Sequence, residues 1–263
     1  MLSADQCDKF LEEGFVRVDD AFPSSVAAQA RETFFHDLRA QGITEDPATW
    51  TRPVVRLGMY PQPHVVAAAS TPRLHAAFDQ LVGPGAWHPC RAMGTVPVRF
   101  PSATDPGDTG WHIDVSFGGD PDDFLSWRAN VHSRGRALLM LFLFSDTGVD
   151  DAPTRIRVGS HRDMARALAL AGEAGLSLRE LLPHFASAPA REEVQATGPA
   201  GTVFLCHPFL VHAAQVHRGT TPRFLAQPPL LPVADRWLPG GPGADRLVAQ
   251  AIAQAAGVPE PAS

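Results

Sequence analysis

The amino-acid sequence predicts a mainly β protein with flanking helices. From about residue 88 onward, short apolar or alternating runs are separated by clusters of Gly, Pro, Asp and Ser, which is typical of a β-sandwich or barrel. Before that point, apolar residues recur at helical spacing instead. The chain has 263 residues, which suits one sizeable core better than two. We therefore expect a single domain over residues 1–263.

The first 87 residues predict a helical layer that contains one short strand. Ser3 can cap a helix over residues 4–13, because its hydroxyl can accept a hydrogen bond from the first turn, and Gly14 ends that helix. Residues 15–18, Phe-Val-Arg-Val, alternate as a strand does.

Two more helices are expected in this layer. The first uses Ser24 or Ser25 as its cap and runs to about Leu38. The second spans residues 71–82 and stops at Gly83, since glycine is favoured just beyond a helix.

Residues 88–232 form the predicted β core. A helical insert at about 162–186 interrupts it, with helices over 162–170 and 176–185, and a last helix covers about 244–256. The strands are expected at 94–100, 112–117, 137–144, 154–158, 202–206, 211–216 and 224–231.

Composition and charge exclude several classes of protein. Hydrophobic residues make up 44% and charged residues 19% of the chain, as in globular proteins. The net charge is −6 and the arginines are scattered, so no basic stripe indicates a nucleic-acid partner. The longest apolar run, 137–144, is too short for a bilayer, and the N-terminus carries charges where a signal peptide is apolar. The three cysteines are widely spaced, so we expect reduced thiols in a cytoplasmic protein. With no signal for nucleic acid or a membrane, the expected partner is a small-molecule substrate.

The tripeptide His112-Ile-Asp114 is the first candidate for chemistry. Residues two apart on a strand point to the same face, so its imidazole and its carboxylate can bind one ion together. A second histidine from another strand would complete two imidazoles and one carboxylate with three open positions. Non-haem Fe(II) oxygenases favour that arrangement.

Two histidines compete to be the third ligand. His212 is followed after 11 residues by Arg223, and His207 stands in the same relation to Arg218. Arg218 precedes a Gly-Thr-Thr-Pro turn and is expected at an exposed hairpin tip. Arg223 instead opens an apolar run and can point into a barrel, where its guanidinium can bind a carboxylate through two hydrogen bonds. We therefore choose His212 and Arg223, and expect His207 to be hydrogen-bonded nearby.

Taken together, these motifs resemble the phytanoyl-CoA dioxygenase-like family of Fe(II)/2-oxoglutarate-dependent oxygenases. The resemblance extends over about residues 4–232. The matching segments are 13–16 (Glu-Gly-Phe-Val), 81–83 (Leu-Val-Gly), 111–114 (Trp-His-Ile-Asp), 158–161 (Val-Gly-Ser-His), 201–208 (Gly-Thr-Val-Phe-Leu-Cys-His-Pro), 212–214 (His-Ala-Ala) and 221–223 (Thr-Pro-Arg).

The resemblance implies a double-stranded β-helix, that is, a jelly-roll, cupin-like barrel. It implies that His112, Asp114 and His212 bind Fe(II) as the catalytic centre, and that Arg223 pairs with the distal carboxylate of 2-oxoglutarate. The implied reaction uses O2, releases succinate and CO2, and hydroxylates or desaturates an unactivated C–H bond of a small or medium-sized molecule. Related halogenases lack the carboxylate ligand, so Asp114 favours hydroxylation over halogenation.

The chain departs from the family pattern at two places. The family usually reads Gly-Cys-Leu where this chain has Ala152-Pro-Thr154, which changes one wall of the pocket. The small polar residue often found two positions beyond the arginine is replaced by Leu225. Either another residue supports the distal carboxylate, or Arg223 does so alone.

Several other residues are candidates for contacts in the pocket. Arg99 can point into the barrel and bind the cofactor, although a solvent-facing arginine is an equal alternative. The Gly-rich segment 118–123 is placed to form a lid, or else a plain connection. The candidates for substrate contact are Phe117, Trp127, Met59 and Tyr60, with Phe124 also flanking the lid. Arg155 and Arg157 share one strand face, for which we favour solvent over an anionic substrate.

Two alternatives to the oxygenase stay open at this stage. The first is a non-catalytic jelly roll that binds a small molecule in the same pocket. The second is a hydrolase that holds zinc at the same three residues and is indifferent to O2.

Overall fold

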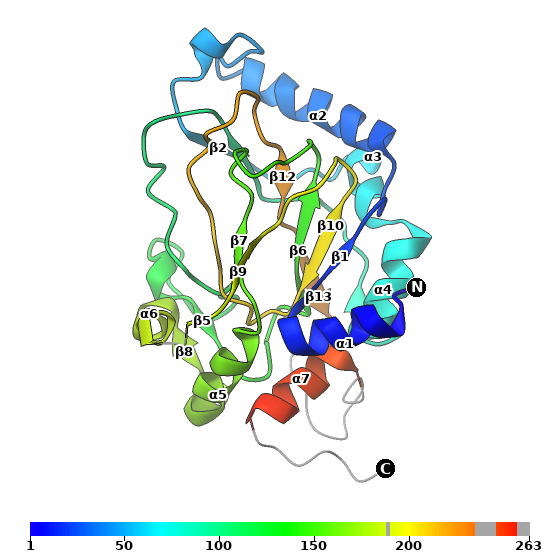
Figure 1. The fold of residues 1–263 in the computed structure, drawn as a ribbon, viewed down its shortest axis with the longest axis vertical. Coiled ribbons are helices and arrows are strands. Elements are labelled where there is room, and N and C mark those ends of the chain that lie inside the picture. The colour runs from blue at the N-terminus through cyan, green and yellow to red at the C-terminus, as the bar shows by residue number, and fades with distance from the viewer. Residues whose placement is uncertain (188–189, 235–245, 257–263) are drawn as a thin grey trace.

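A six-stranded antiparallel sheet forms the centre of the computed structural model, which describes residues 1–187, 190–234 and 246–256 (Figure 1). Strand β6 pairs with three neighbours, β10, β12 and β13. The strands run in the order β1 (Phe15–Val18), β10 (Val203–Cys206), β6 (Leu138–Leu143), β13 (Pro229–Pro232) and β3 (Trp87–His88), with β12 (Leu225–Ala226) beside β6.

Strand β6 is buried on both faces, which explains its unbroken apolar sequence. Successive side chains of a strand point to opposite faces. Leu138, Met140 and Phe142 therefore enter the larger hydrophobic cluster, whereas Leu139 and Leu141 enter a second, smaller one.

The smaller cluster lies between the main sheet and a second sheet. Ile156 of β7 packs there with Leu139 and Leu141 of β6, so the two sheets face each other as in a jelly roll. The second sheet has the order β11 (His212–Ala213), β7 (Arg155–Arg157) and β9 (Glu193–Gln195). Two further pairs are β2 (Val54–Leu57) with β4 (Val96–Arg99), and β5 (Arg128–Ala129) with β8 (Leu176–Ser177). The mainly β jelly-roll fold with flanking helices is thus confirmed.

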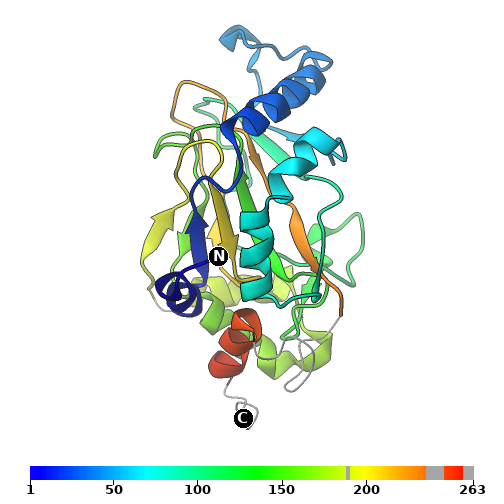
Figure 2. The same ribbon diagram turned by 90° about the vertical axis from the view of Figure 1, so that its right-hand side faces the viewer.

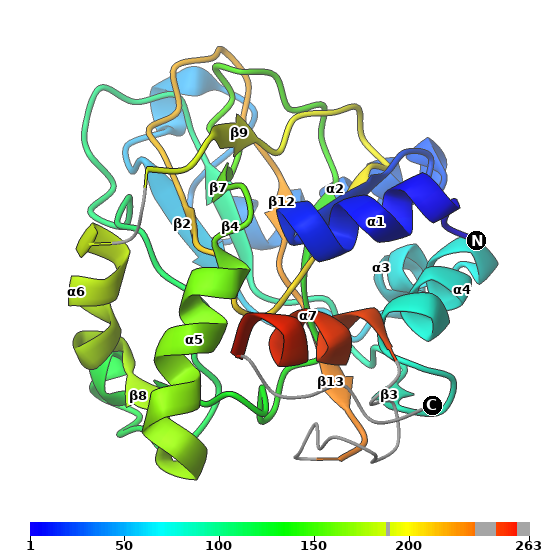
Figure 3. The ribbon, with the colours of Figure 1, turned by 60° about the horizontal axis from the view of Figure 1, so that its bottom comes forward.

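Helices supply the other side of the larger cluster, through side chains such as Phe10, Phe34 and Phe78. Figure 2 shows α1, α4 and α7 together on the side that carries β1, and Figure 3 shows α5 and α6 beside each other on another flank. The helices are α1 (Ala4–Glu13), α2 (Ser24–Arg39), α3 (Pro63–Val66), α4 (Pro72–Leu81), α5 (His161–Ala171), α6 (Leu178–Ser187) and α7 (Leu247–Ala256). Short 3-10 turns cover Pro47–Thr49, Ala67–Ala69, Phe124–Ser126 and Gly172–Ala174.

The helix ends agree with the sequence at α1 but not at α2. Ser3 accepts a hydrogen bond from the Gln6 amide at 3.2 Å, and Gly14 has a φ of +86° just beyond the helix. Helix α2 has no serine cap. Pro23 occupies the cap position instead, because its fixed φ suits the start of a helix.

Two other expectations need correction. Residues 112–117 do not form a strand: only isolated bridges at His112 and Phe117 pair there, because β11 offers just two residues as partners. The N-terminal layer is also less separate than expected, since β1 joins the main sheet and β2 pairs with β4. Strands β2, β3, β5, β8 and β9 and helix α3 were not predicted, since most are too short to show periodicity.

The predicted last helix is present as α7, while residues 244 and 245 of its expected range lie outside the described residues. Among the residues that the structure describes, no helix combines the length and the apolar character needed to cross a membrane.

Candidate metal centre

His112, Asp114 and His212 come together although 98 residues separate the last two. Their nearest ligand atoms all lie within 4.8 Å of one another. A short backbone bridge holds the two histidines: the His112 amide donates to the His212 carbonyl at 3.0 Å, and the reverse hydrogen bond is 2.9 Å. The bridge places the two imidazole centroids 4.4 Å apart.

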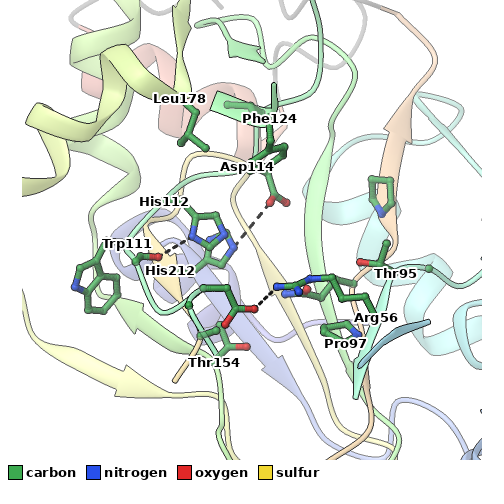
Figure 4. Close-up of a pocket in the computed structure, with 18 of the residues that line it drawn as sticks. Arg56, Thr95, Pro97, Trp111, His112, Asp114, Phe124, Thr154, Leu178 and His212 are labelled. Atoms are coloured by element: carbon green, nitrogen blue, oxygen red, sulfur yellow. Dashed lines mark hydrogen bonds and ion pairs between the residues drawn. The ribbon is translucent and has the colours of Figure 1, made fainter. Parts of the chain in front are cut away.

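Both imidazoles present the same nitrogen to the site. Nδ1 of His112 donates to the Gly110 carbonyl and Nδ1 of His212 to the Leu210 carbonyl, each at 3.0 Å. This contact leaves Nε2 as the free lone pair, which is how metal-binding histidines are commonly held. Nε2 of His212 is buried with no hydrogen-bond partner and lies 3.9 Å from Oδ1 of Asp114 (Figure 4). The donor set and this orphaned nitrogen fit a divalent metal ion.

Asp114 is held ionised by an arginine. Nη1 of Arg136 lies 2.8 Å from Oδ2 of Asp114, which leaves Oδ1 facing His212. Burial alone would raise the pKa of Asp114, but Arg136 and then the two histidines lower it below its ordinary value. The carboxylate therefore stays charged, as a metal ligand must be.

The electrostatics keep His212 neutral. Burial, and next the proximity of His112, lower its pKa to about 4, because both disfavour a second positive charge. A neutral imidazole has a free lone pair for a metal at physiological pH.

Arg223 also lines the site, and no carboxylate of the described residues forms an ion pair with it. Its two Nη atoms donate to the carbonyls of Ala152 at 2.7 Å and Pro97 at 3.1 Å, while its Nε is buried without a partner. Burial, then Arg99, lower the pKa of Arg223 to about 9, against an opposing effect of Asp108. The group still carries its charge near neutral pH, so it is a buried cation available to an anion.

Arg99 lies beside Arg223, since their backbones form a reciprocal bridge. Unlike Arg223, it has a carboxylate partner: its Nη2 donates to both oxygens of Asp108, at 2.8 and 2.7 Å, while its Nε is buried without a hydrogen-bond partner. Asp108 also forms an ion pair with Arg56.

The three candidate ligands and these arginines line one cavity of about 870 Å³. Pockets of this size accept drug-sized molecules. Its walls come from many segments: Arg56, Met59, Gly94, Thr95, Pro97, Arg99, Gly107, Asp108, Gly110, Trp111, His112, Asp114, Val115, Phe124, Leu125, Arg136, Thr154, Leu178, Leu182, His212, Ala214, Arg223, Gln227 and Pro229.

Comparison with protein-family models identifies the chain. The model described as phytanoyl-CoA dioxygenase (PhyH) matches residues 10–225. The chain belongs to the phytanoyl-CoA dioxygenase family. No curated protein gives a significant match.

Solved structures similar to this family member share its fold at low sequence identity. EctD from S. alaskensis has a TM-score of 0.56 and 19% identity, with 93% of this chain and 81% of that chain covered. HygX from Streptomyces hygroscopicus, bound to nickel, 2-oxoglutarate and hygromycin B, has a TM-score of 0.56 and 17% identity, with 90% of each chain covered. The carbocyclase SnoK from nogalamycin biosynthesis has a TM-score of 0.50 and 19% identity, covering 88% and 83%.

In this phytanoyl-CoA dioxygenase family member, Met59 is the one predicted substrate contact of four that lines the cavity. Tyr60 is buried elsewhere, its hydroxyl donating to Asp37 at 2.8 Å. Phe117 lies under the Arg134 guanidinium. Trp127 covers Gly119 and donates from Nε1 to the Asp120 carbonyl at 2.9 Å, so it stabilises segment 118–123 from within. These three side chains do not line this cavity, because strand alternation does not reveal which loop folds back on itself; their contact with a substrate stays a prediction.

The competing histidine lies outside the cavity. His207 is fully buried between α1 and α7, where Nε2 contacts the Val248 carbonyl at 3.4 Å and Nδ1 accepts from the Phe209 amide. Its partner in spacing, Arg218, is exposed as predicted.

Arg155 and Arg157 face neither open solvent nor the cavity. Their guanidinium carbons lie 4.6 and 4.1 Å from the centroid of the Trp111 ring. Cation–π contacts of this kind hold the residue that precedes His112.

Three charged residues that line the cavity were not predicted from the sequence: Arg56, Asp108 and Arg136. The one available signal was Arg136, a charge placed directly before the most apolar strand of a charge-poor chain. Asp108 sits in a loop whose sequence carries no periodic signal.

Proposed function

We propose that the protein is an Fe(II)/2-oxoglutarate-dependent oxygenase that hydroxylates an unactivated C–H bond of a small or medium-sized organic molecule. Succinate and CO2 are the co-products. The observation that carries the proposal is the convergence of His112, Asp114 and His212 in one cavity with the unpaired cation Arg223.

Family membership and fold support this proposal. EctD structures contain iron, or 2-oxoglutarate with 5-hydroxyectoine, and HygX structures contain iron, or nickel with 2-oxoglutarate. The neighbours also include a carbocyclase and an epimerase. The carboxylate ligand Asp114 favours hydroxylation over halogenation, because related halogenases lack that ligand.

The residues of the chain have distinct roles in this mechanism. His112, His212 and Oδ1 of Asp114 would hold Fe(II), with Arg136 fixing the second carboxylate oxygen. Arg223 would bind the distal carboxylate of 2-oxoglutarate, and the carbonyls of Ala152 and Pro97 keep its guanidinium in place. When bound, iron and 2-oxoglutarate supply O2 activation coupled to oxidative decarboxylation. The protein contributes geometry and a site shielded from water.

Anaerobic spectroscopy tests the proposal. Adding 2-oxoglutarate to Fe(II)-loaded protein should produce a weak visible charge-transfer band, because the keto acid chelates the metal. Admission of O2 should then yield succinate, even without the true substrate. The His212→Ala variant should lose the band, whereas His36→Ala, at an exposed site, should retain it. Metal-loaded protein that gives neither band nor succinate would contradict the proposal and favour a binding protein.

A further inference from the structure

The cavity holds more positive charge than the proposed cofactors neutralise. Four arginines line it, Arg56, Arg99, Arg136 and Arg223, against two carboxylates, Asp108 and Asp114. Fe(II) and dianionic 2-oxoglutarate would add equal and opposite charges. Two positive charges therefore remain in the cavity of a protein whose net charge is −6. A positively charged cleft attracts a negatively charged ligand, even where the protein as a whole is negative.

The excess can be assigned to particular side chains. Arg223 would be neutralised by 2-oxoglutarate, and Arg99 is satisfied by the two oxygens of Asp108. Asp108 has one charge for its two arginine partners, so one positive charge of this group is not balanced, and Arg56, whose side chain is 55% exposed at the cavity, is the partner that a ligand can reach. Arg136 carries the second excess positive charge of the cavity, because a metal ion would share its partner Asp114.

The opposite part of the cavity is apolar and open. Of the nine large hydrophobic side chains that are exposed among the described residues, four line this cavity: Met59, Phe124, Leu125 and Leu182. In Figure 4, Phe124 and Leu178 lie on the Asp114 side, whereas Arg56 belongs to a different wall. Such a cluster of exposed apolar side chains marks a binding surface.

From this distribution we infer that the substrate is an organic carboxylate with an apolar body. Its carboxylate binds Arg56, and its apolar part packs on Phe124, Leu125 and Leu182, within reach of the candidate metal centre. This inference rests on the proposed function and adds the substrate class.

Arginine geometry and charge favour a carboxylate over a phosphate ester. Arg99 already binds the Asp108 carboxylate through both oxygens, which shows that the cavity wall accommodates this planar group. A phosphate monoester carries close to two charges, whereas the cavity mouth offers the single charge of Arg56.

Three matched probes test the inference: 4-phenylbutanoate, 4-phenylbutan-1-ol and 4-phenylbutylammonium. They share one apolar body and differ in the charge of the head group. Each is titrated by calorimetry into protein loaded with Ni²⁺ and 2-oxoglutarate, which cannot turn over. We expect the carboxylate to bind roughly tenfold more tightly than the alcohol, and the ammonium to bind most weakly.

Matched variants separate the two parts of the site. Arg56→Gln should bring the carboxylate to within about twofold of the alcohol, while Arg52→Gln, an exposed arginine outside the cavity, should leave the preference intact. Leu182→Asn should weaken the carboxylate and the alcohol alike by roughly three- to tenfold, and Leu170→Asn, on the exposed surface of α5, should weaken neither.

The outcomes distinguish this inference from the proposed function. Binding of 2-oxoglutarate to the nickel-loaded protein is measured first, and its absence would overturn the proposed function. If 2-oxoglutarate binds but the alcohol or the ammonium binds as tightly as the carboxylate, the substrate class is wrong. A preference for the carboxylate that survives Arg56→Gln would also overturn the inference.

Discussion

The protein contains two pairs of neighbouring, tilted histidine rings with different environments. His112 and His212 have ring centroids 4.4 Å apart, and His161 and His207 have centroids 4.9 Å apart. Each pair includes a buried nitrogen without a hydrogen-bond partner, Nε2 of His212 and Nδ1 of His161. Burial lowers the pKa of both of these residues to about 4. In ring spacing, and in having one buried imidazole with a pKa of about 4, the pairs are alike.

They differ in what surrounds them. His212 faces Asp114 and a cavity, whereas His207 packs against Phe10 and Phe209 beneath α1 and α7. Within the described part of the chain, only the first pair joins a carboxylate in a group able to hold a metal. The comparison teaches that a pair of neighbouring imidazoles becomes a metal centre when a carboxylate and open space converge on it.

Replacing one member of each pair would break the comparison most directly. His212→Ala should reduce Ni²⁺ affinity by more than about 100-fold, because it removes a ligand. His207→Ala should keep the metal affinity within a few-fold of the parent and lower the stability instead. Calorimetric titration with Ni²⁺ measures the first effect and urea unfolding the second. If only His207→Ala lost the metal, the third ligand would be His207, and the choice of His212 would be wrong.

One histidine of each pair is followed after 11 residues by an arginine, His212 by Arg223 and His207 by Arg218, and these arginines sharpen the same contrast. Arg223→Ala should weaken 2-oxoglutarate binding by about 30- to 1000-fold, because an anion would lose a buried cation. Arg218→Ala, at an exposed position, should leave the dissociation constant unchanged. Both are measured on Ni²⁺-loaded protein. Equal effects of the two variants would contradict the role given to Arg223.

A substitution at Gly14 tests how tightly the second pair, His161 and His207, is packed. Gly14 has a φ of +86°, and an added methyl group would contact the His161 ring and lie 2.8 Å from Cδ1 of Leu210. Gly14→Ala should therefore lower the free energy of unfolding by about 2–4 kcal/mol. Gly42→Ala is the control: its φ is +79°, but nothing lies within 4 Å, so only backbone strain of about 1 kcal/mol is expected. Similar losses in urea unfolding would show that His161 has room to move.

The pH dependence of stability gives the smallest effect. The pKa of His161 falls from 6.5 to about 4 on folding, first through burial and then through Arg162, so the unfolded chain binds a proton more readily. This residue's contribution is complete above pH 6.5 and is lost as the pH falls towards 4, by an amount on the order of 2–3 kcal/mol. His161→Gln should flatten that slope in urea unfolding, whereas exposed His36→Gln should not. An unchanged slope in His161→Gln would show that other groups dominate.

The parts of the site that the sequence predicts are those with a local pattern. The spacing of His112 and Asp114, and the apolar run after Arg223, are visible in the local sequence, and the fold brings these residues together through isolated bridges although 112–117 is not a strand. Tyr60 and Trp127 could not be placed in this way. The buried Tyr60 donates a hydrogen bond to Asp37 in another segment, and the half-buried Trp127 donates one to the Asp120 carbonyl of its own loop; no local pattern encodes either partner.

The amino-acid sequence alone determined the fold class, the types of the three candidate ligands and their order along the chain. The tertiary structure decided that His212 rather than His207 faces Asp114, and that Arg136, Asp108 and Arg56 set the charge around them. The physical reason is that alternation fixes a side chain's direction relative to its own strand only. The cavity is built from many segments, and its shape and charge exist only after those segments have packed.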